Sequence, residues 1–203
     1  MNLHRLYKRY NFKSTYILYM IILILPLNAT AQTDEPYSKI NLEINFLKSK
    51  PSEFLNKYWD SQFGLQGLVS TPFYLGQIQA GISYYSFKEK EEKYPAFNGF
   101  FMFAGWGKEI RLPLKLVFFS SVRAGTFLMH FAVDTLSAFN NFESELAVNL
   151  NAGFKYRLMD YLSLEIGGEF TSVFLRNKIK FLTAFAGFEY SFNSPIWLKE
   201  FFE

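Results

Sequence analysis

The chain has 203 residues, a formal net charge of +3 and a hydrophobic content of 50%, which suits one domain or at most two small ones. Aromatic residues make up 20% of the sequence, with 25 Phe and 13 Tyr, and this excludes intrinsic disorder and low-complexity sequence. The complete absence of cysteine excludes disulfide bonds, thiolate nucleophiles, zinc sites with Cys ligands and a lipidated N-terminal Cys.

The first 31 residues have the three-part layout of a secretory signal peptide. A basic segment precedes an apolar run at residues 16–27 and the small-residue sequence Ala29-Thr30-Ala31. The alternative is an N-terminal membrane anchor, but the apolar run is shorter than the roughly 20 residues that a helix needs to span a bilayer. We therefore predict cleavage between Ala31 and Gln32.

Removal of this leader changes the charge of the protein. The only charged side chains before Asp34 are basic, namely Arg5, Lys8, Arg9 and Lys13. Without these four, 17 Lys and Arg remain against 18 Asp and Glu, a net charge of −1. The basicity of the full sequence therefore does not point to a nucleic-acid partner, and we expect none.

From residue 39 to residue 192 the dominant pattern is alternation with a period of two, which is typical of strands with one apolar face. It is clearest where Leu146, Val148, Leu150 and Ala152 alternate with smaller or polar residues. Eight strands are predicted, at residues 39–47, 62–70, 77–87, 97–107, 114–132, 145–157, 161–175 and 180–192.

The connections between these strands fall into two classes. Those at residues 71–76, 108–113 and 158–160 are short, whereas those at 48–61, 88–96 and 133–144 are longer and more polar. The last connection, 176–179, is short but belongs to the end with the long loops. This alternation predicts an all-β fold: a closed up-and-down antiparallel transmembrane β-barrel with tight turns at one end and loops at the other.

Alternation alone leaves open whether the apolar face points inward, as in a soluble lipid-binding barrel. An eight-stranded barrel has room for little more than its own interior side chains, so large apolar residues from every strand cannot all point inward. The opposite face is small and polar, with charges of both signs. The predicted lumen charge network comprises Glu43, Lys115, Arg123, Lys155, Arg157, Glu165, Glu169 and Glu189. We therefore predict an apolar face that contacts lipid.

Aromatic residues at the strand ends agree with this orientation, because girdles of such residues suit the two membrane interfaces. We expect the girdle to include Tyr74, Tyr84, Tyr85, Trp106, Tyr156, Tyr161, Phe174, Tyr190 and Phe192, and also Phe97, Phe131 and Phe181. A closed sheet satisfies its backbone hydrogen bonds inside a bilayer, and strands of about 9–11 residues cross it. The 114–132 strand exceeds this length, so its end at 126–132 is expected to project above the membrane.

With this architecture the chain resembles the small eight-stranded outer-membrane barrels related to the OmpA, OmpX and OmpW families. The resemblance includes the final strand, which ends Phe188-Glu189-Tyr190-Ser191-Phe192. It implies the outer membrane of a Gram-negative bacterium, lipid contacts, and the barrel-assembly machinery as a partner during biogenesis. Those barrels usually end at the terminal aromatic residue. Here residues 193–203 follow, predicted to be a short amphipathic tail that lies on the membrane or docks on an envelope partner.

Chemistry-bearing motifs are weak in this sequence. After cleavage His130 is the only histidine, and lipid A deacylases carry His-x-Ser where this chain has His130-Phe131-Ala132. We predict no catalytic residue, no cofactor and no metal site, because a metal site needs several ligands.

The expected function is a structural or surface-interaction role mediated by the loops, with a lumen plugged by polar and charged side chains. The alternatives are a narrow channel or transporter for small or hydrophobic solutes, a membrane-embedded lipid-modifying enzyme, or a soluble periplasmic lipid-binding barrel. Aromatic and apolar residues of the first loop, Phe54, Leu55, Tyr58 and Trp59, either contact a partner or pack over the barrel rim.

Overall fold

The computed structural model divides the chain into residues 1–32 and 33–203, and describes residues 35–90, 94–132, 142–175, 179–195 and 197, all of which belong to the second unit. The predicted signal peptide, with Ala29, Ala31 and Gln32 at its cleavage site, lies outside the described residues. So does most of the predicted 193–203 tail. No helix in the described ranges is long and apolar enough to span a membrane.

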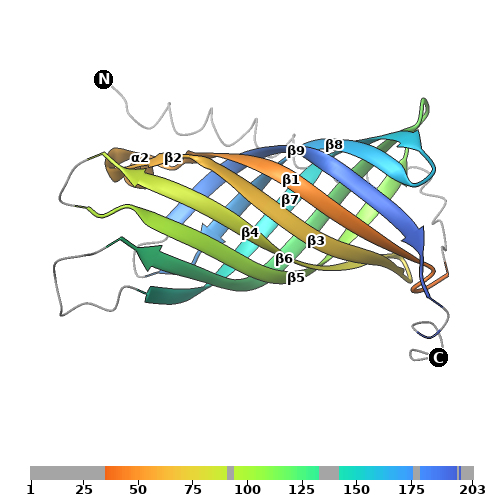
Figure 1. Cartoon of the computed structure of the whole chain (residues 1–203), viewed down its shortest axis with the longest axis horizontal. Coiled ribbons are helices and arrows are strands. Elements are labelled where there is room, and N and C mark those ends of the chain that lie inside the picture. The colour runs from red at the N-terminus through yellow and green to blue at the C-terminus, as the bar shows by residue number, and fades with distance from the viewer. Residues whose placement is uncertain (1–34, 91–93, 133–141, 176–178, 196, 198–203) are drawn as a thin grey trace, which may run out of the picture. The chain divides into compact units, whose positions relative to one another are not determined.

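Eight long antiparallel strands form a closed barrel (Figure 1). They are β1 (Lys39–Pro51), β3 (Phe63–Phe73), β4 (Gly76–Glu89), β5 (Phe97–Arg111), β6 (Leu116–Phe131), β7 (Phe142–Met159), β8 (Leu162–Val173) and β9 (Ile179–Asn193). Neighbours along the chain pair with one another, and β1 pairs with β9 from Lys39↔Asn193 to Pro51↔Phe181, which closes the ring. The predicted fold class is therefore confirmed.

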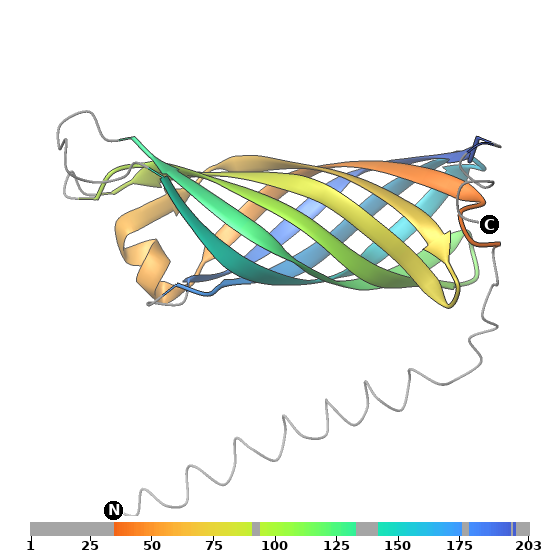
Figure 2. The ribbon, with the colours of Figure 1, turned by 90° about the horizontal axis from the view of Figure 1, so that it is seen from below.

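At one end of the barrel the strands are connected by tight turns, at residues 74–75, 112–115 and 160–161. We call it the turn end and the opposite one the loop end. Tyr74, Leu114 and Lys115 adopt positive φ angles of 47°, 62° and 63°, the left-handed conformation in which a short turn reverses the chain. The predicted separation of turns and loops is thus found in the structure (Figures 1 and 2).

The first long connection is more ordered than the sequence suggested. It contains the end of β1, the helix α2 (Glu53–Tyr58) and the three-residue strand β2 (Trp59–Ser61), which pairs with the end of β4. The strands extend into the predicted loops because their backbones continue to pair: Lys48, Ser49 and Lys50 of β1 face Ala184, Thr183 and Leu182 of β9. Figure 2 shows α2 at the loop end of the barrel.

Alternate residues point to opposite sides of the barrel wall. In β1, Leu42, Ile44 and Phe46 are exposed on the outside, whereas Glu43 and Asn45 are buried inside. Large apolar residues are exposed in this way on every barrel strand. The molecule therefore has the inverted pattern of a membrane barrel, with an apolar exterior and polar groups inside.

Closure of the barrel between its first and last strands can be tested by cross-linking. Ile44 and Phe188 face each other across β1 and β9 on the outer surface, at the spacing of a few ångströms that a disulfide requires. Because the chain has no cysteine of its own, the double variant Ile44→Cys/Phe188→Cys is expected to form an intramolecular disulfide under mild oxidation, seen as a gel shift that reductant reverses.

The matched control is Ile44→Cys/Leu164→Cys, in which β9 separates the two positions. It should stay reduced under the same conditions. Equal cross-linking of both pairs, or of neither, would contradict the closed register.

Candidate functional site in the barrel interior

The interior of the barrel is divided into a polar part and an apolar part. Charged side chains gather toward the turn end, and aromatic side chains gather toward the loop end. The loop-end group, which we call the aromatic zone, is buried and consists of Leu55, Tyr85, Phe87, Phe97, Phe101, Phe127, Met129 and Phe181. The prediction that the inward face is small and polar therefore fails at the loop end, and at the turn end Phe119 also points inward, with its ring centroid 5.1 Å from Lys155 Nζ.

A single lysine organises the turn-end charges. Lys155 of β7 is buried, and its Nζ lies 3.1 Å from Glu43 Oε1 and 2.9 Å from Glu109 Oε1. It also forms an ion pair with Glu189. These carboxylates come from β1, β5 and β9, so one ammonium group joins four strands around the barrel. We call Lys155, Glu43, Glu109 and Glu189 the lysine-centred cluster.

A separate ion pair lies between this cluster and the aromatic zone. Arg123 Nη1 is 3.7 Å from Glu169 Oε2, and Arg123 Nε donates a hydrogen bond of 2.6 Å to Gln79 Oε1. The hydroxyl of Tyr85 donates to Glu169 Oε1 at 2.7 Å. Tyr85 thus connects the polar layer to the aromatic rings that follow it, since its ring centroid lies 5.9 Å from that of Phe127.

Glu165 differs from the other interior carboxylates. It faces Lys155 in the β7–β8 register and is only 3% exposed, yet neither of its carboxylate oxygens has a hydrogen-bond partner among the described residues. Four carboxylates therefore surround the single ammonium of Lys155. The turn-end interior therefore carries more acidic than basic groups, unlike the predicted network of four basic and four acidic residues.

One member of the predicted lumen network, Lys115, lies outside the barrel interior, and another, Arg157, is at its edge. Lys115 is exposed in the turn before β6, because β6 begins only at Leu116, so it is not an interior residue. Arg157 is half-buried at the turn end of β7, where its backbone N–H donates a hydrogen bond to the Lys115 carbonyl. Glu109 also belongs to the interior, although the sequence predicts a connection at residues 108–113, because β5 continues to Arg111. Gly107 points inward, and the period of two places Glu109 on the same face of the strand. This alternation is the sequence signal that could have identified Glu109.

The predicted aromatic girdle also needs correction. Tyr85, Phe97 and Phe181 are each at most 3% exposed and point into the barrel. Tyr84 and Tyr85 are consecutive strand residues, so only one of them can face outward, and that one is Tyr84. Phe131 is half-buried and packs against the interior rings. Seven of the predicted residues lie on the outer surface or in turns, with exposures of 37–69%: Tyr74, Trp106, Tyr156, Tyr161, Phe174, Tyr190 and Phe192. Their place at a membrane interface stays a prediction.

The first loop folds over the loop-end rim. Leu55 of α2 is fully buried within the aromatic zone, and Trp59 packs edge-on against Phe97 with ring centroids 5.5 Å apart. Trp59 Nε1 donates a hydrogen bond of 2.9 Å to the Pro95 carbonyl. Leu55 and Trp59 thus pack over the rim, whereas Phe54 remains 48% exposed at the loop end.

His130 lies on the outside of β6, exposed, opposite Asn98 of β5 and Phe142 of β7. Neither neighbour is a nucleophile or an acid, so this part of the structure does not assemble a hydrolytic triad. Within the described ranges, no three His, Asp or Glu residues are grouped in a way that could hold a metal ion.

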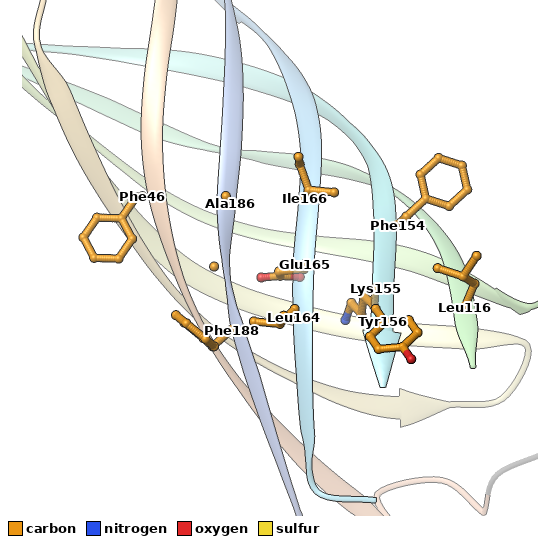
Figure 3. Close-up of a pocket in the computed structure, with 11 residues that line it drawn as sticks. Phe46, Leu116, Phe154, Lys155, Tyr156, Leu164, Glu165, Ile166, Ala186 and Phe188 are labelled. Atoms are coloured by element: carbon orange, nitrogen blue, oxygen red, sulfur yellow. The ribbon is translucent and has the colours of Figure 1, made fainter. Parts of the chain in front are cut away.

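A groove of about 440 Å³ lies on the outer surface over β6 to β9 and β1 (Figure 3). Its sides are the large side chains of Phe46, Phe154, Ile166 and Phe188, and its floor includes Ala186. Ala186 is paired with both Phe46 and Ile166, so a single small residue between two large ones opens the hollow. The lining is almost wholly apolar.

The fold matches two solved outer-membrane barrels. Neisserial surface protein A superposes with a TM-score of 0.58 at 11% identity, covering 76% of this chain and 96% of that protein. Ail, the attachment invasion locus protein of Yersinia pestis, gives a TM-score of 0.53 at 15% identity, covering 76% and 99%. No protein-family profile and no curated protein matches the sequence. The fold is thus that of the small eight-stranded outer-membrane barrels, which confirms the resemblance.

Replacement of Lys155 tests the lysine-centred cluster. Lys155→Met keeps the length of the side chain but leaves Glu43, Glu109 and Glu189 without their common cation. Loss of one partner from a buried ion pair costs about 3–5 kcal/mol. We expect the free energy of unfolding to fall by about that amount, measured by urea titration in phosphatidylcholine vesicles.

Lys115→Met is the matched control, because it removes the same charge from an exposed turn. Its effect should stay within roughly 0.5 kcal/mol. A Lys155→Met variant as stable as Lys115→Met would mean that the cluster does not hold the strands together.

Proposed function

We propose that the protein is an integral outer-membrane barrel with a filled, non-conducting interior, and that it acts through the surface at its loop end. The observation that carries this proposal is the stacking of two different fillings inside one narrow barrel. A ring of buried aromatic side chains lies above a cross-strand ion-pair cluster, so a solute would have to displace both.

The aromatic zone supports a closed interior at the loop end. Phe87 and Phe97 stack with ring centroids 4.6 Å apart, and Phe181 packs edge-on against both Phe87 and Phe127. Leu55 of α2 covers these rings from the loop side. Aromatic rings in such contacts exclude water, and an ion crossing them would lose its hydration without gaining a polar partner.

The lysine-centred cluster supports closure at the turn end. Lys155 lies at the centre of the interior, held by carboxylates from three other strands. An ion passing this level would have to break at least one buried pair, which is expensive in a region of low dielectric constant.

The loop end supports a surface role because its ordered parts still present apolar groups to the outside. Phe54 of α2, Phe63 of β3 and Phe142 of β7 are 48%, 73% and 52% exposed. Exposed aromatic groups of this kind are typical of contact surfaces. The two matched barrels are described as a surface protein and as an attachment invasion locus protein, which fits such a role.

We propose no enzymatic activity, because neither residue paired with His130 in the described strands, Asn98 or Phe142, is a nucleophile or an acid. We also propose that β9, with its alternating Phe188, Tyr190 and Phe192, is the strand that the barrel-assembly machinery recognises.

The unpartnered carboxylate of Glu165 favours one alternative function, a narrow path for cations along the turn-end interior, since charged groups inside a membrane often mark ion paths.

Planar-bilayer recording separates the two functions. The wild-type protein is expected to be silent at all applied voltages, because the aromatic zone and the lysine-centred cluster both close the interior. As a control, protein from the same vesicles is run on a gel without boiling and after boiling. A band that shifts on boiling shows that folded barrels are present in the vesicles. Reproducible single-channel steps, selective for cations and lost in Glu165→Gln, would overturn the closed interior in favour of the path.

A further inference from the structure

Three lysines share one patch on the outside of the barrel at its loop end. Lys48 and Lys50 of β1 and Lys180 of β9 are exposed. Lys48 and Lys50 are two residues apart on one face, hence about 7 Å apart. Lys50 is paired with Leu182, and the Ser52 N–H donates to the Lys180 carbonyl, so Lys180 is the diagonal neighbour of Lys50 at about 7–8 Å. We call these three residues the lysine patch.

The lysine patch forms no ion pair with the side chains that the structure describes. Lys48 Nζ donates to the Ser61 carbonyl at 2.8 Å and lies 4.9 Å from the centre of the Phe63 ring, and neither group is anionic. No ion pair involves Lys50 or Lys180 among the described residues. The outward positions of the eight barrel strands hold no Asp or Glu in those ranges. Like charges this close repel one another, so the patch is suited to an anion.

The surface directly below the patch is apolar and hollowed. Phe46 is two residues from Lys48, and Ala186 is two residues from Ala184, the partner of Lys48 across β1 and β9. Both Phe46 and Ala186 line the outer groove (Figure 3), which continues over β8 and β7. A cationic patch and an apolar groove therefore follow one another along the same pair of strands.

We propose that the lysine patch and the groove together bind one membrane lipid that carries a phosphate head group and an acyl chain. The phosphate oxygens accept hydrogen bonds from the lysine ammonium groups, and the acyl chain fills the hollow over Ala186. Lysine suits this boundary because its stem packs on apolar surface while its charge reaches the head-group layer. Free phosphate would not use the groove. The inference rests on the proposed membrane function, since it requires lipid around the barrel.

The test titrates phosphatidic acid with two oleoyl chains into the full chain, folded in uncharged detergent micelles, and records the temperature at which the folded gel band disappears. A ligand that binds only the folded state raises this temperature in proportion to its affinity and concentration. Phosphatidic acid is expected to raise it in a saturable manner, whereas phosphatidylcholine with the same chains should not.

Charge variants identify the head-group site. The triple variant Lys48→Gln/Lys50→Gln/Lys180→Gln should need at least about tenfold more phosphatidic acid to reach half of the maximal rise in this temperature. The reason is that each basic residue near an anionic lipid surface contributes to binding. The corresponding triple Lys→Arg variant should respond as the wild type does, which separates loss of charge from misfolding. The matched control Lys57→Gln/Lys88→Gln/Lys108→Gln removes the same charge elsewhere and should respond as wild type.

The groove is tested by Ala186→Phe, which fills it without changing charge. This variant should need about tenfold more dioleoyl phosphatidic acid but respond as wild type to the dihexanoyl form, whose chains are too short to use the groove. Equal losses in both triple Gln variants, or stabilisation by inorganic phosphate as strong as by phosphatidic acid, would overturn the inference while leaving a folded barrel. Absence of any folded band would instead contradict the proposed membrane function, and this inference with it.

Discussion

The structure depends on one constraint, the hydrogen bonding of backbone N–H and C=O groups where no water can reach them. Within a bilayer a sheet meets this constraint only if it has no free edge. Here the pairing of β1 with β9 runs through thirteen residues of β1, from Lys39 to Pro51, and leaves no unpaired edge along the barrel. Closure fixes which face of every strand points outward. It therefore determines that Ile44 and Phe46 lie on the outer surface and that Glu43 and Asn45 lie inside.

Closure with only eight strands also makes the interior narrow, and that explains its composition. Each level must be filled by side chains that satisfy one another, because a narrow barrel has space for little else. The chain does this in two ways, with ion pairs around Lys155 toward the turn end and stacked rings around Phe127 toward the loop end. Tyr85 joins the two by using its hydroxyl on Glu169 and its ring against Phe127. The described interior side chains thus form two layers joined by Tyr85, and the proposal of a closed interior rests on these contacts.

The eight strands and the separation of turns from loops could be predicted because strand periodicity and connection lengths are local properties of the sequence. The aromatic zone could not be predicted, because β4 and β5 carry apolar residues on both faces, as in Phe100-Phe101-Met102-Phe103. Without alternation of apolar and polar residues, the sequence does not indicate which of these side chains point inward. The same effect misplaced Tyr85. The ion pair between Lys155 and Glu109 joins non-neighbouring strands, so neither residue indicates the other. Lys115 was misplaced because β6 begins one residue later, at Leu116, which puts Lys115 in the turn.

The most direct test of the central claim, that the strands cross the outer membrane, is the accessibility of opposite barrel ends in intact cells. Lys57 of α2 is exposed at the loop end, and Leu114 is 84% exposed at the turn end. Because the chain has no cysteine, a membrane-impermeant maleimide reports each single Cys variant separately. Lys57→Cys should be labelled in intact cells, and Leu114→Cys only after the outer membrane is permeabilised. Labelling of both variants before permeabilisation, or of neither until then, would contradict the account.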